Sequence, residues 1–211
     1  MTRSTRLVWL LLPLLAACQR PTPLQQAQRS LARAEQLDSQ LDSSDDPARV
    51  SAVRDRAFDQ AARLFAALPA EQAALPETQL GLASIAWRRH QNLPAAFAAV
   101  NGVIQTLQPL SSDDLRRPRA SGATGQALLA RAYAARASYL VSRYTESGAA
   151  PDAPPRLPPG PLQQALEDAD RAVGLDPQRD FILLRDSLRR LEGGPTAPLD
   201  PAGLTSREPA K

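Results

Sequence analysis

The sequence predicts an all-α fold, and three observations support this prediction. Aromatic residues make up only 4% of the chain and runs of β-branched residues are few. Alanine, leucine, glutamine and arginine dominate, and these residues have high helix propensities. Apolar residues also recur at steps of three and four along several segments, which is the period of an amphipathic helix. We therefore expect antiparallel helix pairs stacked on one another around an apolar core.

Two amphipathic helices are expected in the first part of the domain. The first begins near Leu24 and carries an apolar stripe at three- and four-residue steps: Leu24, Ala27, Leu31, Ala34, Leu37 and Leu41. Asp46 and Pro47 then have the residue types of an N-cap and a first helical residue. The second stripe comprises Val50, Val53, Ala57, Ala61, Leu64 and Leu68 and is widened by Phe58 and Phe65, and Pro69 closes this helix. Each stripe predicts one buried helix face.

The middle of the chain predicts an antiparallel pair and a long helix. Helical periodicity runs from residue 76 to 90, breaks at Asn92-Leu93-Pro94, and resumes over 95–107. The polar connection 111–118 is expected to hold a short helical turn. A long helix follows over 125–144.

A proline-rich segment separates this long helix from the last two helices. Residues 148–161 hold six prolines, which predicts an extended or disordered loop. Helices are expected over 162–175 and 181–191, the second capped by Asp180 and stopped by Gly193-Gly194. The helical domain thus covers 24–192, and the proline-rich residues 193–211 predict a disordered tail.

The first 18 residues have the order of features of a secretory signal. Arg3 and Arg6 precede an apolar run that ends at Ala17 and is too short to span a bilayer. The ending Leu15-Ala16-Ala17-Cys18 resembles the lipobox of bacterial lipoproteins. The resemblance implies that residues 1–17 are removed and that Cys18, the only cysteine, carries a diacylglyceryl group. A plain secretory peptide with an incidental thiol is the alternative.

A lipoprotein signal implies a location as well as a modification. Residues 18–23 would form a lipidated cysteine and a proline-rich tether, and several acyl chains give stable membrane attachment. Gln19 stands where some members of this family carry the aspartate that retains them at the inner membrane. The resemblance therefore implies anchoring in the outer membrane, with the domain facing the periplasm.

One stretch resembles a tetratricopeptide repeat. Residues 162–177, with small residues at Ala165, Ala169 and Ala172 and a terminal Pro177, are similar to the second helix of that repeat. Leu129-Ala130-x-x-Tyr133 is similar to its first helix. A weaker copy, Leu82-Ala83-x-x-Ala86 followed by Ala95, Ala99 and Gly102, departs from the family pattern at Gln79, Ala86 and Pro109. The resemblance implies a short tetratricopeptide-like solenoid, and a generic helical bundle is the alternative.

The same resemblance implies a binding surface. First helices of such repeats line a concave groove, and the positions that follow their small residue face the ligand. Carried onto this chain, these positions are Ser84, Trp87 and Arg88 after Ala83, and Arg131, Ala134 and Ala135 after Ala130. The predicted binding residues among them are Ser84, Trp87, Arg88 and Arg131. A tryptophan beside an arginine is typical of binding hot spots. A core position for Trp87 is the alternative.

Residues able to support catalysis are scarce. His90 is the only histidine, so no second histidine or free cysteine is at hand to share a metal. Gly-x-Ser-x-Gly, phosphate-loop and His-Glu-x-x-His motifs are all missing from the sequence. Glu77 and Glu167 are interpreted as solvated helix positions. We therefore expect no enzymatic activity, no metal and no cofactor.

The charge pattern does not favour nucleic-acid binding. Removing residues 1–17 removes two of the 25 basic residues and none of the 22 acidic ones, so the remaining charges nearly balance. The arginine cluster at Arg116, Arg117 and Arg119 is interpreted as a solvated face.

The sequence therefore predicts a lipid-anchored adaptor of the cell envelope that binds another envelope protein or peptide. Two alternatives stay open. One is an accessory subunit or small enzyme of cell-wall or polysaccharide metabolism, and the other is a purely structural spacer lipoprotein.

Overall fold

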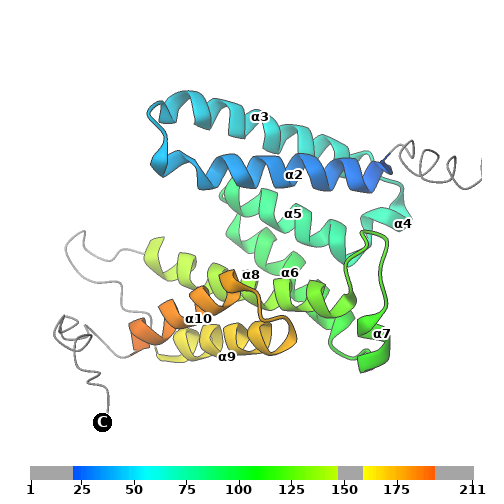
Figure 1. Ribbon diagram of the computed structural model, residues 1–211, viewed down its shortest axis with the longest axis vertical. Coiled ribbons are helices and arrows are strands. Elements are labelled where there is room, and N and C mark those ends of the chain that lie inside the picture. Colours follow the sequence, from blue (N-terminus) through cyan, green and yellow to red (C-terminus); the bar gives the residue numbers. More distant parts are fainter. Residues whose placement is uncertain (1–20, 147–158, 193–211) are drawn as a thin grey trace, which may run out of the picture. The chain divides into compact units, whose positions relative to one another are not determined.

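The computed structural model describes residues 21–146 and 159–192, and it is all-α over this part of the chain (Figure 1). No β-strand occurs among these residues, and Pro118 and Thr124 form an isolated antiparallel bridge. The predicted fold class is confirmed. The chain divides into two compact units, residues 1–89 and 90–211, and each is described by itself.

The first unit consists of a long helical hairpin and a third helix packed against it. Its elements are α2 (Pro23–Ser39), a 3₁₀ turn (Leu41–Ser43), α3 (Pro47–Ala66), the short α4 (Ala70–Ala73) and α5 (Pro76–Arg88). Helices α2 and α3 lie side by side along their length, and α5 packs on both of them (Figure 1). These bounds match the expected helices to within a few residues.

Local capping explains where the first two helices begin. Asp46 is the N-cap of α3, since its carboxylate accepts a hydrogen bond from the Arg49 backbone N–H, and Pro47 is the first helical residue, as predicted. Thr22 caps α2 in a reciprocal box with Gln25. Thr22 and Pro23 therefore belong to the helical unit and not to the expected tether, because a threonine cap followed by proline starts a helix.

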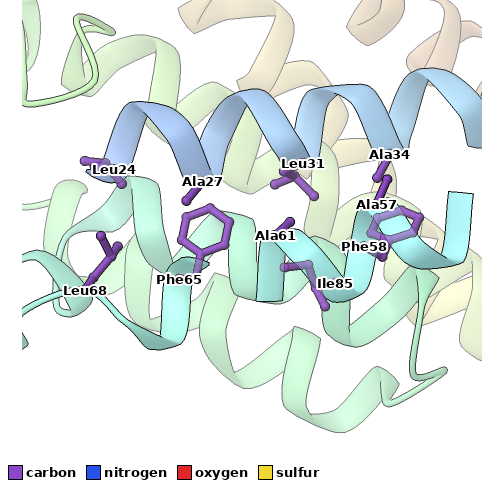
Figure 2. Close-up of a cluster of buried hydrophobic side chains, with 10 residues drawn as sticks. All are labelled: Leu24, Ala27, Leu31, Ala34, Ala57, Phe58, Ala61, Phe65, Leu68 and Ile85. Carbon is purple, nitrogen blue, oxygen red and sulfur yellow. The ribbon is translucent and has the colours of Figure 1, made fainter. Parts of the chain in front are cut away.

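Small and large residues alternate across the contact between α2 and α3 (Figure 2). Figure 2 shows Leu24 near Leu68 at one end and Ala34 near Phe58 further along, so the two helices run antiparallel. The buried cluster comprises Leu24, Ala27, Leu31, Ala34, Ala57, Phe58, Ala61, Phe65, Leu68 and Ile85. The stripe predicted for the first helix is thus buried from Leu24 to Ala34.

The second unit also consists of antiparallel helices. Its elements are α6 (Leu93–Leu107), α7 (Ser112–Arg116), α8 (Gly125–Glu146), α9 (Pro159–Leu175) and α10 (Arg179–Glu192). Helix α8 packs along both α6 and α9, and α10 packs on α9. The predicted break before α6 is confirmed, since Gln91 has a φ of 51° and Asn92 caps the helix through the Ala95 N–H. The helix resumes at Leu93, two residues earlier than expected, so Leu93 and Pro94 are helical. The short helical turn expected over 111–118 is α7.

Two expected boundaries in this unit are wrong. Helix α9 begins at Pro159, so Pro159 and Pro161 lie in its first turn and not in a loop. Proline is tolerated there because the first-turn N–H groups have no partner within the helix. Asp180 is the second residue of α10 and therefore not its N-cap.

Alanines allow close packing between α8, α9 and α10. Ala165, Ala169 and Ala172 are fully buried. The Gln126 side chain donates a hydrogen bond to the Leu175 carbonyl at 2.6 Å, which joins the start of α8 to the end of α9. The small residues predicted to support helix contact thus do so.

Several expectations fall outside the described residues. These are the signal peptide at 1–17, Cys18, the loop up to residue 158 and the tail at 193–211. The expected pairing of α5 with α6 joins the two units, so it is not described either. In the part of the chain that is described, no helix has the length and apolar character needed to cross a bilayer.

Candidate functional site

Helix α5 carries three of the four predicted binding residues. Its core side is fixed by Ile85, which is buried against α2 and α3. Trp87 is half-buried on the last turn, and the Arg88 guanidinium carbon lies 5.1 Å from the centroid of its ring. This distance allows a cation–π interaction. Trp87 is therefore neither a fully buried core residue nor a fully exposed one.

Ser84 and Arg88 bind acidic residues of α2. The Ser84 hydroxyl donates a hydrogen bond to Glu35 at 2.6 Å, and Arg88 forms an ion pair with Asp38. Both contacts lie one turn apart and hold α5 against α2. The two side chains thus stabilise the unit, and the pair with Asp38 fixes where the Arg88 guanidinium sits over the indole.

An ion-pair network continues from Asp38 across α3. Arg54 reaches Asp38 at 3.1 Å and Asp55 at 2.8 Å, and Arg89 reaches Asp59 at 2.9 Å and Asp55 at 3.4 Å. Desolvation of Arg54 opposes its charge, but its hydrogen bond to Asp55 and the pair with Asp38 outweigh this, so its pKa is raised. The hydrogen bond to Asp59 likewise raises the pKa of Arg89. Both arginines stay charged and hold the ends of α2 and α5 against the middle of α3.

Arg131, the fourth predicted residue, lies on α8 in the second unit. Its side chain is exposed, and no ion pair to it occurs among the described residues. Ser84, Trp87 and Arg88 belong to the first unit and Arg131 to the second, so the structure does not place Arg131 relative to the other three. Ala134, a neighbouring groove position in the repeat resemblance, is 7% exposed.

The second unit has a buried polar centre that the sequence did not predict. Arg136 of α8 donates two hydrogen bonds of 2.7 Å to the carboxylate of Asp168 of α9, which is 1% exposed. Arg136 also donates to Asn101 of α6 at 3.0 Å. The hydrogen bonds to Asp168 outweigh the cost of burial and raise the pKa of Arg136. One guanidinium therefore connects three helices.

Tyr133 completes this centre. Its ring is 3% exposed, and the guanidinium carbons of Arg136 and Arg171 each lie 5.5 Å from its centroid. The sequence did hold a signal: Asp168 lies three residues after Ala165 and four before Ala172, on the side of α9 that is otherwise small and apolar. An acid at such a position needs a buried partner.

The second unit also contains an apolar cavity. It has a volume of about 300 Å³ and is lined by Leu93, Pro94 and Phe97 from the first turns of α6 and by Arg143 near the end of α8. Phe97 also packs on the core cluster formed by α8, α9 and α10. The sequence pattern at Leu93 and Pro94 predicted only a break between helices.

The residues considered for catalysis differ in how deeply they are buried. Glu167 and His90 are exposed, but Glu77 is 4% exposed, so its interpretation as a solvated position is wrong. Glu77 lies in the first turn of α5, where its neighbours Pro76 and Thr78 are buried as well. In residues 21–146 and 159–192, no group of three or more His, Cys, Asp or Glu side chains is arranged to hold a metal ion.

Arg116 and Arg117 are exposed, which agrees with their interpretation as a solvated face, and Arg117 pairs with Asp114 at 3.1 Å. The interpretation is wrong for Arg119, which is half-buried and whose Nε atom is buried. Comparisons of the chain with protein-family models, with curated proteins and with solved structures found no match. The fold therefore defines a class, an all-α protein of packed helix pairs.

Proposed function

We propose that this protein is a lipid-anchored adaptor of the bacterial cell envelope that binds another envelope protein or peptide and has no catalytic role. The anchor is proposed from the ending Leu15-Ala16-Ala17-Cys18 and the preceding charged and apolar segments. Attachment to the outer membrane, facing the periplasm, is proposed from Gln19.

The observation that carries the binding role is the pair formed by Trp87 and Arg88. A half-buried indole beside a guanidinium 5.1 Å from its centroid offers a rigid apolar surface with a charged edge. Such pairs are enriched among residues that dominate binding energy. The contacts of Ser84 and Arg88 with α2 support this role, since side chains held in place before binding lose less entropy when a partner docks.

We further propose that the helix pairs form a short tetratricopeptide-like solenoid. Support comes from the pair α8 and α9, where Tyr133 and the three alanines 165, 169 and 172 are buried at the positions that the repeat pattern assigns to packing. In such an array, neighbouring pairs bury a continuous core and present an extended binding surface.

Site-directed photocrosslinking in intact cells tests the binding role. A photoreactive amino acid at position 87 should give a discrete crosslinked product in the membrane fraction, identified by mass spectrometry. The matched control carries the same amino acid at Gln60, an exposed position on α3 of the same unit. A spacer without a partner would give equal and diffuse labelling at both positions, and that result would refute the adaptor role.

A further inference from the structure

The cavity between α6 and α8 points to the chemistry of the partner. We propose that it docks a partner segment that presents one large apolar side chain next to an aspartate or glutamate carboxylate. This inference rests on the proposed adaptor function and deepens it by naming what is recognised and where.

The size and walls of the cavity select a single side chain. Its volume of about 300 Å³ is at the lower limit for ligand pockets, so it accommodates a leucine or phenylalanine side chain better than a cofactor. Leu93 is 9% exposed, and Phe97 packs on the apolar core below. An inserted apolar side chain therefore extends a packed core and is removed from contact with water.

The outer face of α6 leaves room for the backbone of the segment. Helix α6 contains no charged residue, and its exposed positions as far as residue 102 are small or rigid: Pro94, Ala95, Ala98 and Gly102. A Cβ atom added at Gly102 would meet nothing within 4 Å. The long exposed side chain of α6, Gln105, lies beyond these positions, so the part of the helix beside the cavity leaves room for an extended peptide.

Arg143 sets the charge of the segment. Among the described residues that line the cavity, Arg143 alone carries a formal charge. A guanidinium has five N–H donors in a planar fork, so it can donate hydrogen bonds to a carboxylate even while it holds another contact. A lysine or arginine on the partner at this point would be repelled. Charge complementarity therefore favours an acidic, apolar segment over a basic one.

A binding assay with a defined peptide tests this directly. The probe is fluorescein-labelled Gly-Ser-Phe-Asp-Ser-Gly, and its binding to the full-length protein in detergent micelles is followed by fluorescence anisotropy. We expect saturable binding that weakens when the probe's Phe becomes Ser. Arg143→Gln should weaken binding on the order of tenfold, the effect of losing one charge-assisted hydrogen bond.

If Arg143 binds the probe's carboxylate, the effect of removing Arg143 must depend on whether the probe carries that carboxylate. A probe with Asn in place of Asp should bind wild type and Arg143→Gln equally, because neither pair has the carboxylate contact. Arg116→Gln, which removes an exposed arginine of α7, is the matched control and should bind like wild type. Absence of saturable binding, or equal loss in the Arg116 and Arg143 variants, overturns the proposal.

Crosslinking in cells separates failure of the cavity from failure of the adaptor function. A photoreactive amino acid at Ala98 should capture the same protein as one at position 87. Capture only from position 87 leaves the adaptor role intact and refutes the cavity as a docking site. Capture only from Ala98 supports the cavity and refutes the α5 surface, and capture from neither refutes both.

Discussion

The guanidinium of Arg136 holds the carboxylate of Asp168 through two parallel hydrogen bonds of 2.7 Å, inside a unit that has no other such bidentate pair among its described residues. The carboxylate is 1% exposed, and Arg171 approaches it only to 3.9 Å, so Arg136 provides most of the stabilisation of its charge. The pair connects α8 to α9, and Asn101 connects it to α6. Its geometry leads to the first prediction.

Arg136→Met should lower the free energy of unfolding by about 3–5 kcal/mol, because it leaves the Asp168 carboxylate buried without its partner. Combining it with Asp168→Leu should recover most of this loss, since the buried charge is then removed as well. Arg189→Met is the control, because Arg189 and Asp170 form a half-exposed pair at 2.9 Å and should contribute at most about 1 kcal/mol. Urea unfolding of the full-length variants measures all three, and equal losses at Arg136 and Arg189 would contradict the prediction.

Gly81→Ala should destabilise the first unit. A Cβ at Gly81 would lie 2.5 Å from the ring of Phe65, which is 2% exposed and cannot move without disturbing the core. Overpacking of this kind costs about 1–3 kcal/mol. Gly102→Ala, in the interior of α6 with open space at its Cβ position, should instead stabilise by roughly 0.5–1 kcal/mol. Thermal unfolding shows whether each substitution raises or lowers the melting temperature. A Gly81→Ala variant as stable as the wild type would show that Phe65 can shift.

Trp87→Ala should weaken binding of the crosslinked partner by about 2 kcal/mol or more, as truncation of an interface anchor does. Its effect on stability should be small, because the indole is only half-buried. Phe58→Ala provides the contrast, since this fully buried ring should cost about 3–5 kcal/mol of stability. Melting temperature and partner affinity are measured on the same samples. A large stability loss with unchanged affinity in the folded fraction would reassign Trp87 to the core.

Cys18→Ser should release the protein from the membrane fraction. Several acyl chains anchor a protein stably in a membrane, and this substitution removes the residue that would carry them. Mass spectrometry of the wild-type protein should find an acylated N-terminus at Cys18. An intact chain that begins at an unmodified Met1 would refute the lipoprotein assignment.

Much of the fold follows from local sequence. The stripe from Leu24 to Ala34 became the buried face of α2, and Asp46 became the cap of α3, because both depend on residues within one or two helical turns. The end of α9 at Leu175, before Pro177, was predicted for the same reason. Its start was not, since proline both breaks helices and begins them, and only the neighbouring packing decides which applies.

The candidate sites depend on contacts that are distant in sequence. Ser84 lies 49 residues from Glu35, and Arg136 lies 32 from Asp168. The apolar period within one helix does not determine how that helix is aligned against its neighbour. The burial of Glu77 escaped prediction for the same reason, because a first-turn glutamate is normally solvated and its burial is set by what packs over it.

Local sequence predicts that this chain forms helices, where most of them begin and end, and for most of them which face is apolar, since these properties arise from backbone hydrogen bonding and side-chain period. Contacts between helices determine that Arg88 is held by Asp38, that Asp168 is buried with Arg136, and that Leu93, Pro94, Phe97 and Arg143 line one cavity. These relationships arise from side-chain packing between helices, where shape and charge must match across a contact that the linear order of residues does not encode.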